Sequence, residues 1–283
     1  MKKNLIILFL IYSCSNSKSN STIENYRIKP LDTLKFSYHG FNNGAKLNLI
    51  SNGFFINEDY VYGCVGGGFR KKVFGKYQIK NNQLTLLPEK IKYTEFPLDF
   101  ESKPKTSNVS YGPDSLKIKT KFQIVKWGDN EYLLSDYFHF GWGIGKENDY
   151  LRFADYLNDG SEPKSSGMYL VNKTNDPITT EFDLKQIPKK WQKHFLKEPI
   201  SAKIKSIEKI IDSNDDDYIY WKIELDKGEK DRMNKRLTLV TKNEEFFIEV
   251  DSVLINTSYG TTNMYDFSPK KFPIGTELRT KWK

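Results

Sequence analysis

The chain has 283 residues and a net charge of +8, with 44 basic residues against 36 acidic ones. This length suffices for one large domain or two small ones, and an aromatic content of 14% argues against disorder throughout. Two cysteines cannot supply a disulfide-dense scaffold or a four-cysteine zinc site, and three histidines leave little for a histidine-rich metal centre. We therefore expect neither a cofactor nor a bound metal.

The first residues have the pattern of a secretory signal peptide. Lys2 and Lys3 precede an apolar run over residues 5–12, which is shorter than the roughly 20 residues that a membrane-spanning helix needs. The segment Ile11-Tyr12-Ser13-Cys14 resembles the lipobox of bacterial lipoproteins. This resemblance implies cleavage before Cys14 and attachment of lipid to that residue. The alternative is an ordinary cleaved signal with an incidental cysteine.

The lipobox divides the N-terminal region into two parts. Residues 1–13 are expected to form the signal peptide, and residues 14–30 a lipid-anchored tether, because the stretch from Ser15 to Thr22 is polar and lacks hydrophobic periodicity. The resemblance implies an exported lipoprotein of the bacterial cell envelope, facing the periplasm or the cell surface, with the membrane as its partner through Cys14. Cys64 then has no partner for an intramolecular disulfide.

Residues 31–175 read as a β-rich domain. Apolar and polar residues alternate over Lys46–Ile50, Val73–Ile79 and Ile118–Ile124, which predicts antiparallel strands with one buried face. The pair Asn81-Asn82 suits a two-residue hairpin turn. One helix is expected near 148–158, with Asn148 or Asp149 as its N-cap and Gly160 in its stop signal.

Residues 176–283 read as a second, smaller β-barrel-like domain. Pro188 predicts a short helix containing Trp191 and Phe195. Strands are then expected over Ala202–Ile211 and Ile219–Leu225, followed by a face formed by Phe246, Ile248, Val250 and Leu254, and a last strand near Leu278. The whole chain is therefore expected to be mainly β, with two antiparallel modules of barrel or sandwich type, each with a short helix.

The loop before the predicted helix combines aromatic rings, glycines and carboxylates. Such a loop can stack against a sugar or an apolar ligand group, while its carboxylates supply polar contacts. Packing of the loop onto the core is the alternative. The candidate ligand contacts are Tyr137, His139, Phe140, Trp142, Glu147 and Asp149.

Other motifs do not carry a recognisable chemistry. The glycine-rich stretch Gly63–Phe69 lacks the Lys-Ser/Thr pair of a phosphate-binding loop, and Asp212–Asp217 lacks the glycine and the glutamate of a calcium loop. His39 and His194 have no partner at the spacing of a metal site or a triad. Basic and acidic residues are interleaved, which disfavours nucleic-acid binding. No catalytic residue is therefore assigned.

A longer segment resembles a pattern in uncharacterised exported bacterial proteins. It comprises Trp127–Leu133, Phe153–Pro163 and Gly167–Leu170, and it implies no particular activity. The sequence thus favours a lipid-anchored envelope protein that binds a ligand or supports an assembly without catalysis. The alternatives are an envelope hydrolase that acts on a glycan, with carboxylates near Trp142 and Tyr150, or a carrier of a small apolar ligand inside the N-terminal barrel.

Overall fold

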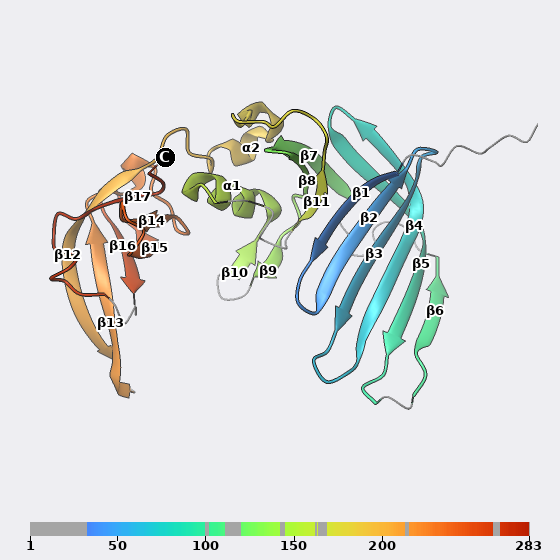
Figure 1. Ribbon diagram of the computed structural model, residues 1–283, viewed down its shortest axis with the longest axis horizontal. Coiled ribbons are helices and arrows are strands. Elements are labelled where there is room, and N and C mark those ends of the chain that lie inside the picture. Colours follow the sequence, from blue (N-terminus) through green and yellow to red (C-terminus); the bar gives the residue numbers. More distant parts are fainter. Residues whose placement is uncertain are drawn as a thin grey trace, which may run out of the picture. The chain divides into compact units, whose positions relative to one another are not determined.

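The computed structural model describes residues 33–99, 102–110, 120–141, 145–161, 163, 169–212, 215–262 and 267–282. The predicted signal peptide, tether and lipidation residue Cys14 lie outside these ranges. Within them the protein is mainly β and contains two closed antiparallel barrels, as predicted, with few short helices (Figure 1).

Eight strands of the described chain close the first barrel, and a ninth extends it at β5. Neighbouring strands pair antiparallel throughout. The closing strands are β1 (Thr33–His39), β2 (Asn43–Ile50), β3 (Phe54–Tyr62), β4 (Gly68–Lys80), β5 (Gln83–Phe96), β7 (Lys121–Trp127), β8 (Asn130–Leu134) and β11 (Leu170–Lys173), and the extension is β6 (Lys105–Val109).

The β4–β5 hairpin closes the barrel. Asn81 and Asn82 form its two-residue turn with φ angles of 52° and 58°, which confirms the predicted turn. The register shifts after Phe74, where Gly75 faces Pro88. A side chain could not replace the hydrogen of Gly75, because a Cβ atom there would lie 2.1 Å from the carbonyl oxygen of Leu87. Beyond this bulge β5 pairs with β6, and before it β5 pairs with β7.

Aliphatic and aromatic side chains fill the interior of the first barrel. They come from alternate positions of every closing strand, as the pleat requires. Leu47, Val73, Leu84 and Leu133 have no exposed surface. The buried cluster is completed by Phe36, Ala45, Leu49, Phe55, Leu86, Ile91, Phe122 and Leu170.

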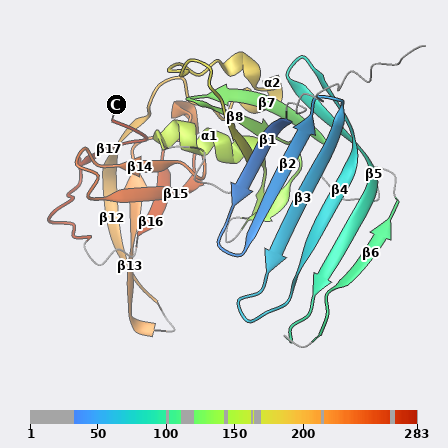
Figure 2. The same cartoon turned by 45° about the vertical axis from the view of Figure 1, so that its right-hand side comes forward.

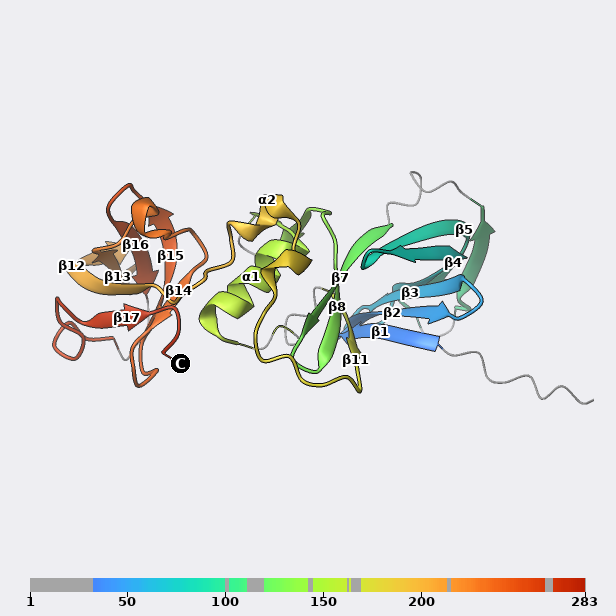
Figure 3. The same cartoon turned by 90° about the horizontal axis from the view of Figure 1, so that it is seen from above.

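A helical layer covers the outer side of β7, β8 and β11 (Figure 3). Helix α1 (Asp149–Asp159) begins at the predicted cap, where the Asn148 side chain accepts a hydrogen bond from the Leu151 amide, and ends at Gly160 with φ 80°. Its Phe153 packs against Tyr132 of β8 at 5.1 Å between ring centres. Helix α2 (Lys189–Gln192) adds the buried Trp191 to the same layer.

The helical layer includes residues that follow position 175, where the sequence pattern predicted the boundary between the two domains. Helix α2 ends at Gln192, so Phe195 follows the helix, where the sequence pattern predicted that it belongs to it. Phe195 is nevertheless buried with Phe153, because it stacks on Phe182 at 5.7 Å. The helix predicted for the second module thus packs on the first barrel.

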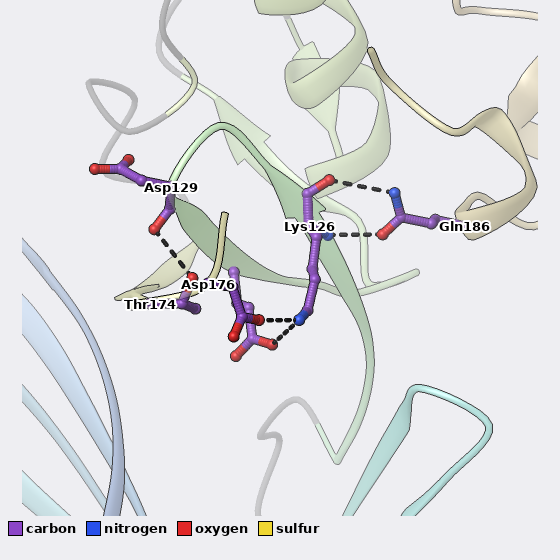
Figure 4. A network of polar contacts seen from close by, with 6 residues as sticks. Lys126, Asp129, Thr174, Asp176 and Gln186 are labelled. Atoms are coloured by element: carbon purple, nitrogen blue, oxygen red, sulfur yellow. Dashed lines mark hydrogen bonds and ion pairs between the residues drawn. The ribbon is translucent and has the colours of Figure 1, made fainter. Parts of the chain in front are cut away.

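Lys126 of β7 forms an ion pair and hydrogen bonds with the segment that follows β11 (Figure 4). Its ammonium contacts the carboxylates of Asp176 and, at 3.7 Å, Glu131, and these two groups raise the pKa of Lys126. Its backbone amide donates to the Gln186 side-chain oxygen at 2.7 Å, and its carbonyl accepts from the Gln186 amide at 3.2 Å. Gln186 belongs to the 3-10 helix η3 (Leu184–Gln186). These hydrogen bonds hold the segment between β11 and α2 against the first barrel.

Six strands form the second closed barrel. They are β12 (Ser201–Asp212), β13 (Asp215–Leu225), β14 (Thr238–Val240), β15 (Phe247–Val253), β16 (Ser258–Thr262) and β17 (Glu277–Arg279), with the 3-10 helix η4 (Glu229–Asp231) between β13 and β14. Ile223, Leu225, Leu239 and Leu278 are fully buried at its centre. The strands predicted over Ala202–Ile211, over Ile219–Leu225 and near Leu278 are therefore confirmed.

One residue of the predicted inner face is misplaced. Leu254 lies just after β15 and is 56% exposed, whereas Phe246, Ile248 and Val250 are buried as predicted. The pairing of β15 with β16 shifts its register between Val250 and Ser252. A bulge adds one residue and reverses the alternation, so the apolar side chain at position 254 no longer faces the core.

We predict that Leu47→Ala destabilises the protein by about 3 kcal/mol, because it removes a fully buried side chain and leaves a cavity in the first barrel. Urea unfolding followed by circular dichroism measures the change. Leu34→Ala is the matched control, since Leu34 is 46% exposed on the adjacent strand and its truncation should cost well under half as much. Equal losses for the two variants would contradict a packed interior.

Candidate anion-binding surface

On the outer side of β1 to β5, the strand register fixes which side chains lie beside one another. Three rows of directly paired residues cross it, and they alternate with the rows that fill the barrel. Figure 2 shows the five strands side by side. The rows are Lys35–Asn48–Ile56–Phe74–Lys90, Ser37–Lys46–Glu58–Lys72–Lys92 and His39–Gly44–Tyr60–Arg70–Thr94.

These rows carry six cationic side chains and one carboxylate, Glu58; we call them the basic face. The cations are Lys35, Lys46, Arg70, Lys72, Lys90 and Lys92. Among the described residues, Lys35, Lys46, Lys90 and Lys92 make no ion pair, and all four are exposed. Lys72 and Lys92 stand directly opposite each other, an arrangement that is electrostatically unfavourable in a sheet.

A cleft of about 340 Å³ opens within the basic face. Arg70, Lys72 and Lys92 supply positive charge to its wall, and Thr94 supplies a hydroxyl group. Ile56 and Phe74 supply the apolar part of the wall of this cleft. The cleft therefore combines hydrogen-bond donors for an anion with a small apolar floor.

Glu58 and the neighbouring rings orient the cations of the cleft. Lys72 lies 2.8 Å and Arg70 lies 3.4 Å from the Glu58 carboxylate. Arg70 also donates to the Tyr62 hydroxyl at 2.8 Å, and this bond together with Glu58 raises the pKa of the guanidinium. The guanidinium lies 5.8 Å from the centre of the Phe96 ring. One carboxylate thus organises two cations without neutralising the face.

The sequence pattern did not single out this surface. Its lysines occupy the polar positions of alternating strands, where a lysine ordinarily marks a solvated face. What distinguishes them is their concentration on neighbouring strands, which depends on register across β1 to β5. Of the six cations, only Lys46 lies in a strand that the sequence pattern predicted, so the excess appears only once the observed strands and their register are known.

The residues of the predicted ligand loop lie in different elements of the structure. His139 and Phe140 lie in β9 (His139–Gly141), Glu147 in β10 (Gly145–Glu147), and Trp142 lies outside the described residues. Tyr137 is 55% exposed. Asp149 is buried at the start of α1, where its carboxylate accepts from the Ser135 amide at 2.8 Å. For the described side chains, the loop thus contributes one exposed ring and one structural carboxylate.

The carboxylate of Asp136 lies close to this loop and binds the helical layer. It accepts from the Trp191 indole at 2.6 Å and from the Lys190 ammonium at 2.7 Å. Trp191 stacks on Tyr150 at 5.5 Å, and burial of Tyr150 together with the charges of Asp136 and Asp149 raises the pKa of the Tyr150 hydroxyl. Asp136 and Asp149 therefore both act as hydrogen-bond acceptors that hold the fold.

A smaller cleft, of about 220 Å³, lies beside an ion pair between α1 and the second barrel. Asp155 of α1 accepts two hydrogen bonds from Arg236, at 2.9 Å and 2.6 Å. Burial raises the pKa of Asp155 to about 6, although Arg236 and Arg152 oppose the shift. The desolvation of the carboxylate thus exceeds the attraction of its partners, as is common for buried ion pairs.

The remaining sequence motifs lie in hairpins. Gly63–Phe69 spans the β3–β4 connection, where Cys64 is exposed and its sulfur accepts a hydrogen bond from the Asn42 side-chain Nδ2 at 3.0 Å. The stretch Asp212–Asp217 spans the β12–β13 hairpin. His39 lies 3.1 Å from the Tyr60 hydroxyl, whereas His194 accepts from the Asn158 side chain through its carbonyl. In the described part of the chain, no three His, Cys, Asp or Glu residues could hold a metal together.

No family model, curated protein or solved structure matches this chain. Among the helices of the described residues, none has the length and apolarity required to cross a membrane.

We predict that Asp155 makes the protein less stable as the pH rises from about 4 to about 6. Its folded-state pKa is raised, so the folded protein holds the proton more tightly than the unfolded chain, and that stabilisation is lost as the pH passes through the folded pKa. Relative to Asp155→Asn, the wild type should lose up to about 3 kcal/mol across this interval. Urea unfolding of both proteins at a series of pH values measures the difference, and a constant difference would contradict the raised pKa.

Proposed function

We propose that this protein is a lipid-anchored envelope protein that binds an anionic ligand through the basic face and has no catalytic role. The lipobox-like segment ending at Cys14 supports the anchor. The observation that carries the binding function is the presence of six cations and only one carboxylate in these three rows of the sheet. A surface of this kind attracts anions over several ångströms and holds them by charge-assisted hydrogen bonds.

The cleft is where the strongest contacts are expected. Arg70 presents a planar guanidinium that is suited to phosphate, sulfate or carboxylate oxygens, and Glu58 and Tyr62 restrict its motion. Lys92 faces the same cleft and has no competing carboxylate within the described chain. An anion bound between Arg70, Lys72 and Lys92 would also relieve the repulsion between the two lysines.

One alternative is that the protein carries a small apolar ligand inside the first barrel, and the packing of this barrel weighs against it. Leu47, Val73, Leu84 and Leu133 are fully buried against one another at its centre. Admission of a ligand would require these side chains to move out of a packed core, at a cost of several kcal/mol. The exposed outer face requires no such rearrangement, which is why we place binding there.

We predict that the protein incorporates a palmitate analogue in bacterial cells and that Cys14→Ser abolishes the incorporation, because the cysteine thiol is the proposed attachment atom. Gel fluorescence after coupling of the analogue to a dye measures labelling. Cys64→Ser is the matched control and should be labelled like the wild type, since Cys64 lies in the β3–β4 hairpin. Equal labelling of Cys14→Ser and the wild type would refute the anchor.

We predict that the protein binds dextran sulfate, a flexible polyanion, and that its affinity falls as the salt concentration rises. The double variant Lys72→Ala/Lys92→Ala should bind about tenfold more weakly, because it removes two cations from the cleft. Fluorescence anisotropy with labelled dextran sulfate measures both effects.

The matched control for this measurement is Lys209→Ala/Lys242→Ala. It removes the same charge from exposed lysines of the second barrel that form no ion pair with any described residue. It should bind nearly as the wild type does. Equal weakening by the two double variants would show that net charge, and not the basic face, determines binding.

A further inference from the structure

We infer that the basic face docks on the surface of an anionic phospholipid bilayer. This inference rests on the proposed function and identifies the anionic partner of the same surface. The cations are distributed over a sheet: they occupy four of five neighbouring strands in three adjacent rows. With ordinary strand and residue spacings, the rows cover about 19 Å by 14 Å. A patch of this extent can contact several headgroup phosphates of a bilayer at once.

The end of the basic face nearest the β2–β3 turn carries exposed apolar side chains. Phe54 and Leu87 lie in the next row, on either side of Lys76, and are 44% and 39% exposed. Lys76 contacts Glu89 at 4.0 Å, so this pair adds little net charge. Such side chains can enter the boundary between headgroups and acyl chains while the lysines remain with the phosphates.

Aromatic rings flank the opposite end of the basic face. Tyr60 and Tyr62 have ring centres 5.4 Å apart, and Tyr62 lies 5.5 Å from Phe96. Tyrosine combines an apolar ring with a polar hydroxyl, which suits the interface of a bilayer. The face thus has cations at its centre and amphipathic or apolar groups at both ends, as expected of a surface that rests on lipid.

The length of chain before the first barrel brings this surface to the membrane. The proposed anchor is at position 14, and β1 begins at position 33 with Lys35 already on the basic face. An extended chain over that interval reaches at most about 65 Å. Lipidation at Cys14 would therefore keep the basic face at high effective concentration beside the bilayer, so that even a weak surface interaction is occupied.

The test uses the full chain with Cys14→Ser, which separates surface docking from covalent lipidation. Binding is measured by co-flotation with vesicles of phosphatidylcholine alone and of phosphatidylcholine mixed with phosphatidylglycerol. We expect binding to the anionic vesicles above the level seen with neutral ones, and we expect high salt to reverse it. Both triple variants described below retain residues 1–13, so comparison between them controls for any contribution from Lys2, Lys3 and the apolar run at residues 5–12.

The decisive variant adds Lys46→Glu, Lys90→Glu and Lys92→Glu, three exposed cations without an ion pair in the described chain. We expect it to bind anionic vesicles about a hundredfold more weakly. The matched control adds Lys209→Glu, Lys235→Glu and Lys242→Glu on the second barrel and should retain most of the binding. Thermal unfolding checks the fold. Lys92→Glu places a carboxylate opposite Lys72, whereas Lys46→Glu places one opposite Glu58, so the two changes should largely offset each other and leave the stability near that of the wild type.

Two outcomes would overturn the inference. If both triple variants lose binding equally, the attraction depends on net charge and not on this face. If the Cys14→Ser protein ignores anionic vesicles but still binds dextran sulfate through Lys72 and Lys92, the partner is a soluble polyanion. In that case the proposed binding function stands and the bilayer inference fails.

Discussion

Closure of the first barrel is the constraint on which the rest of the structure depends. Strand β5 performs it by pairing with β4 along the hairpin and with β7 over only Gln83–Thr85. Two backbone bonds extend this junction, from Leu86 to Thr120 at 2.7 Å and from Ile124 to Asn82 at 2.7 Å. Once the sheet closes, every strand has an inner and an outer side, and the inner volume accepts only the side chains that fill it.

Because the interior is occupied by apolar groups, polar and charged residues of the closing strands must lie mainly outside. The outer side then divides in two. On β7, β8 and β11 it carries Val125, Tyr132 and Val171, which α1 and α2 cover. On β1 to β5 it carries the basic face. The site and the core are therefore alternate positions of the same strands, and a shift of register by one residue would exchange them.

Local sequence patterns predicted the parts of the fold that depend on neighbouring residues. The Asn81-Asn82 turn, the Asn148 cap of α1 and the alternation along β13 each follow from a few adjacent positions. These local patterns did not predict features that depend on pairing between distant segments. The bulge that exposes Leu254 depends on the partner strand β16. The basic face likewise needed the register of five strands, so its lysines looked like ordinary solvent-facing residues.

Clustering of like charges explains why the basic face is better suited to binding than to stability. Lys72 and Lys92 are opposed across one strand pair, and Lys35, Lys46 and Lys90 make no ion pair among the described residues. Their repulsion raises the free energy of the folded barrel relative to the unfolded chain, where the charges are farther apart. The proposed anionic partner would bind the folded arrangement more tightly than the unfolded chain, so its binding energy would offset the repulsion and stabilise the barrel. Replacement of Glu58 by a neutral residue would leave Arg70 and Lys72 without their shared counter-charge. Glu58 therefore reduces the repulsion between Arg70 and Lys72 and leaves the other cations of the face available to a ligand.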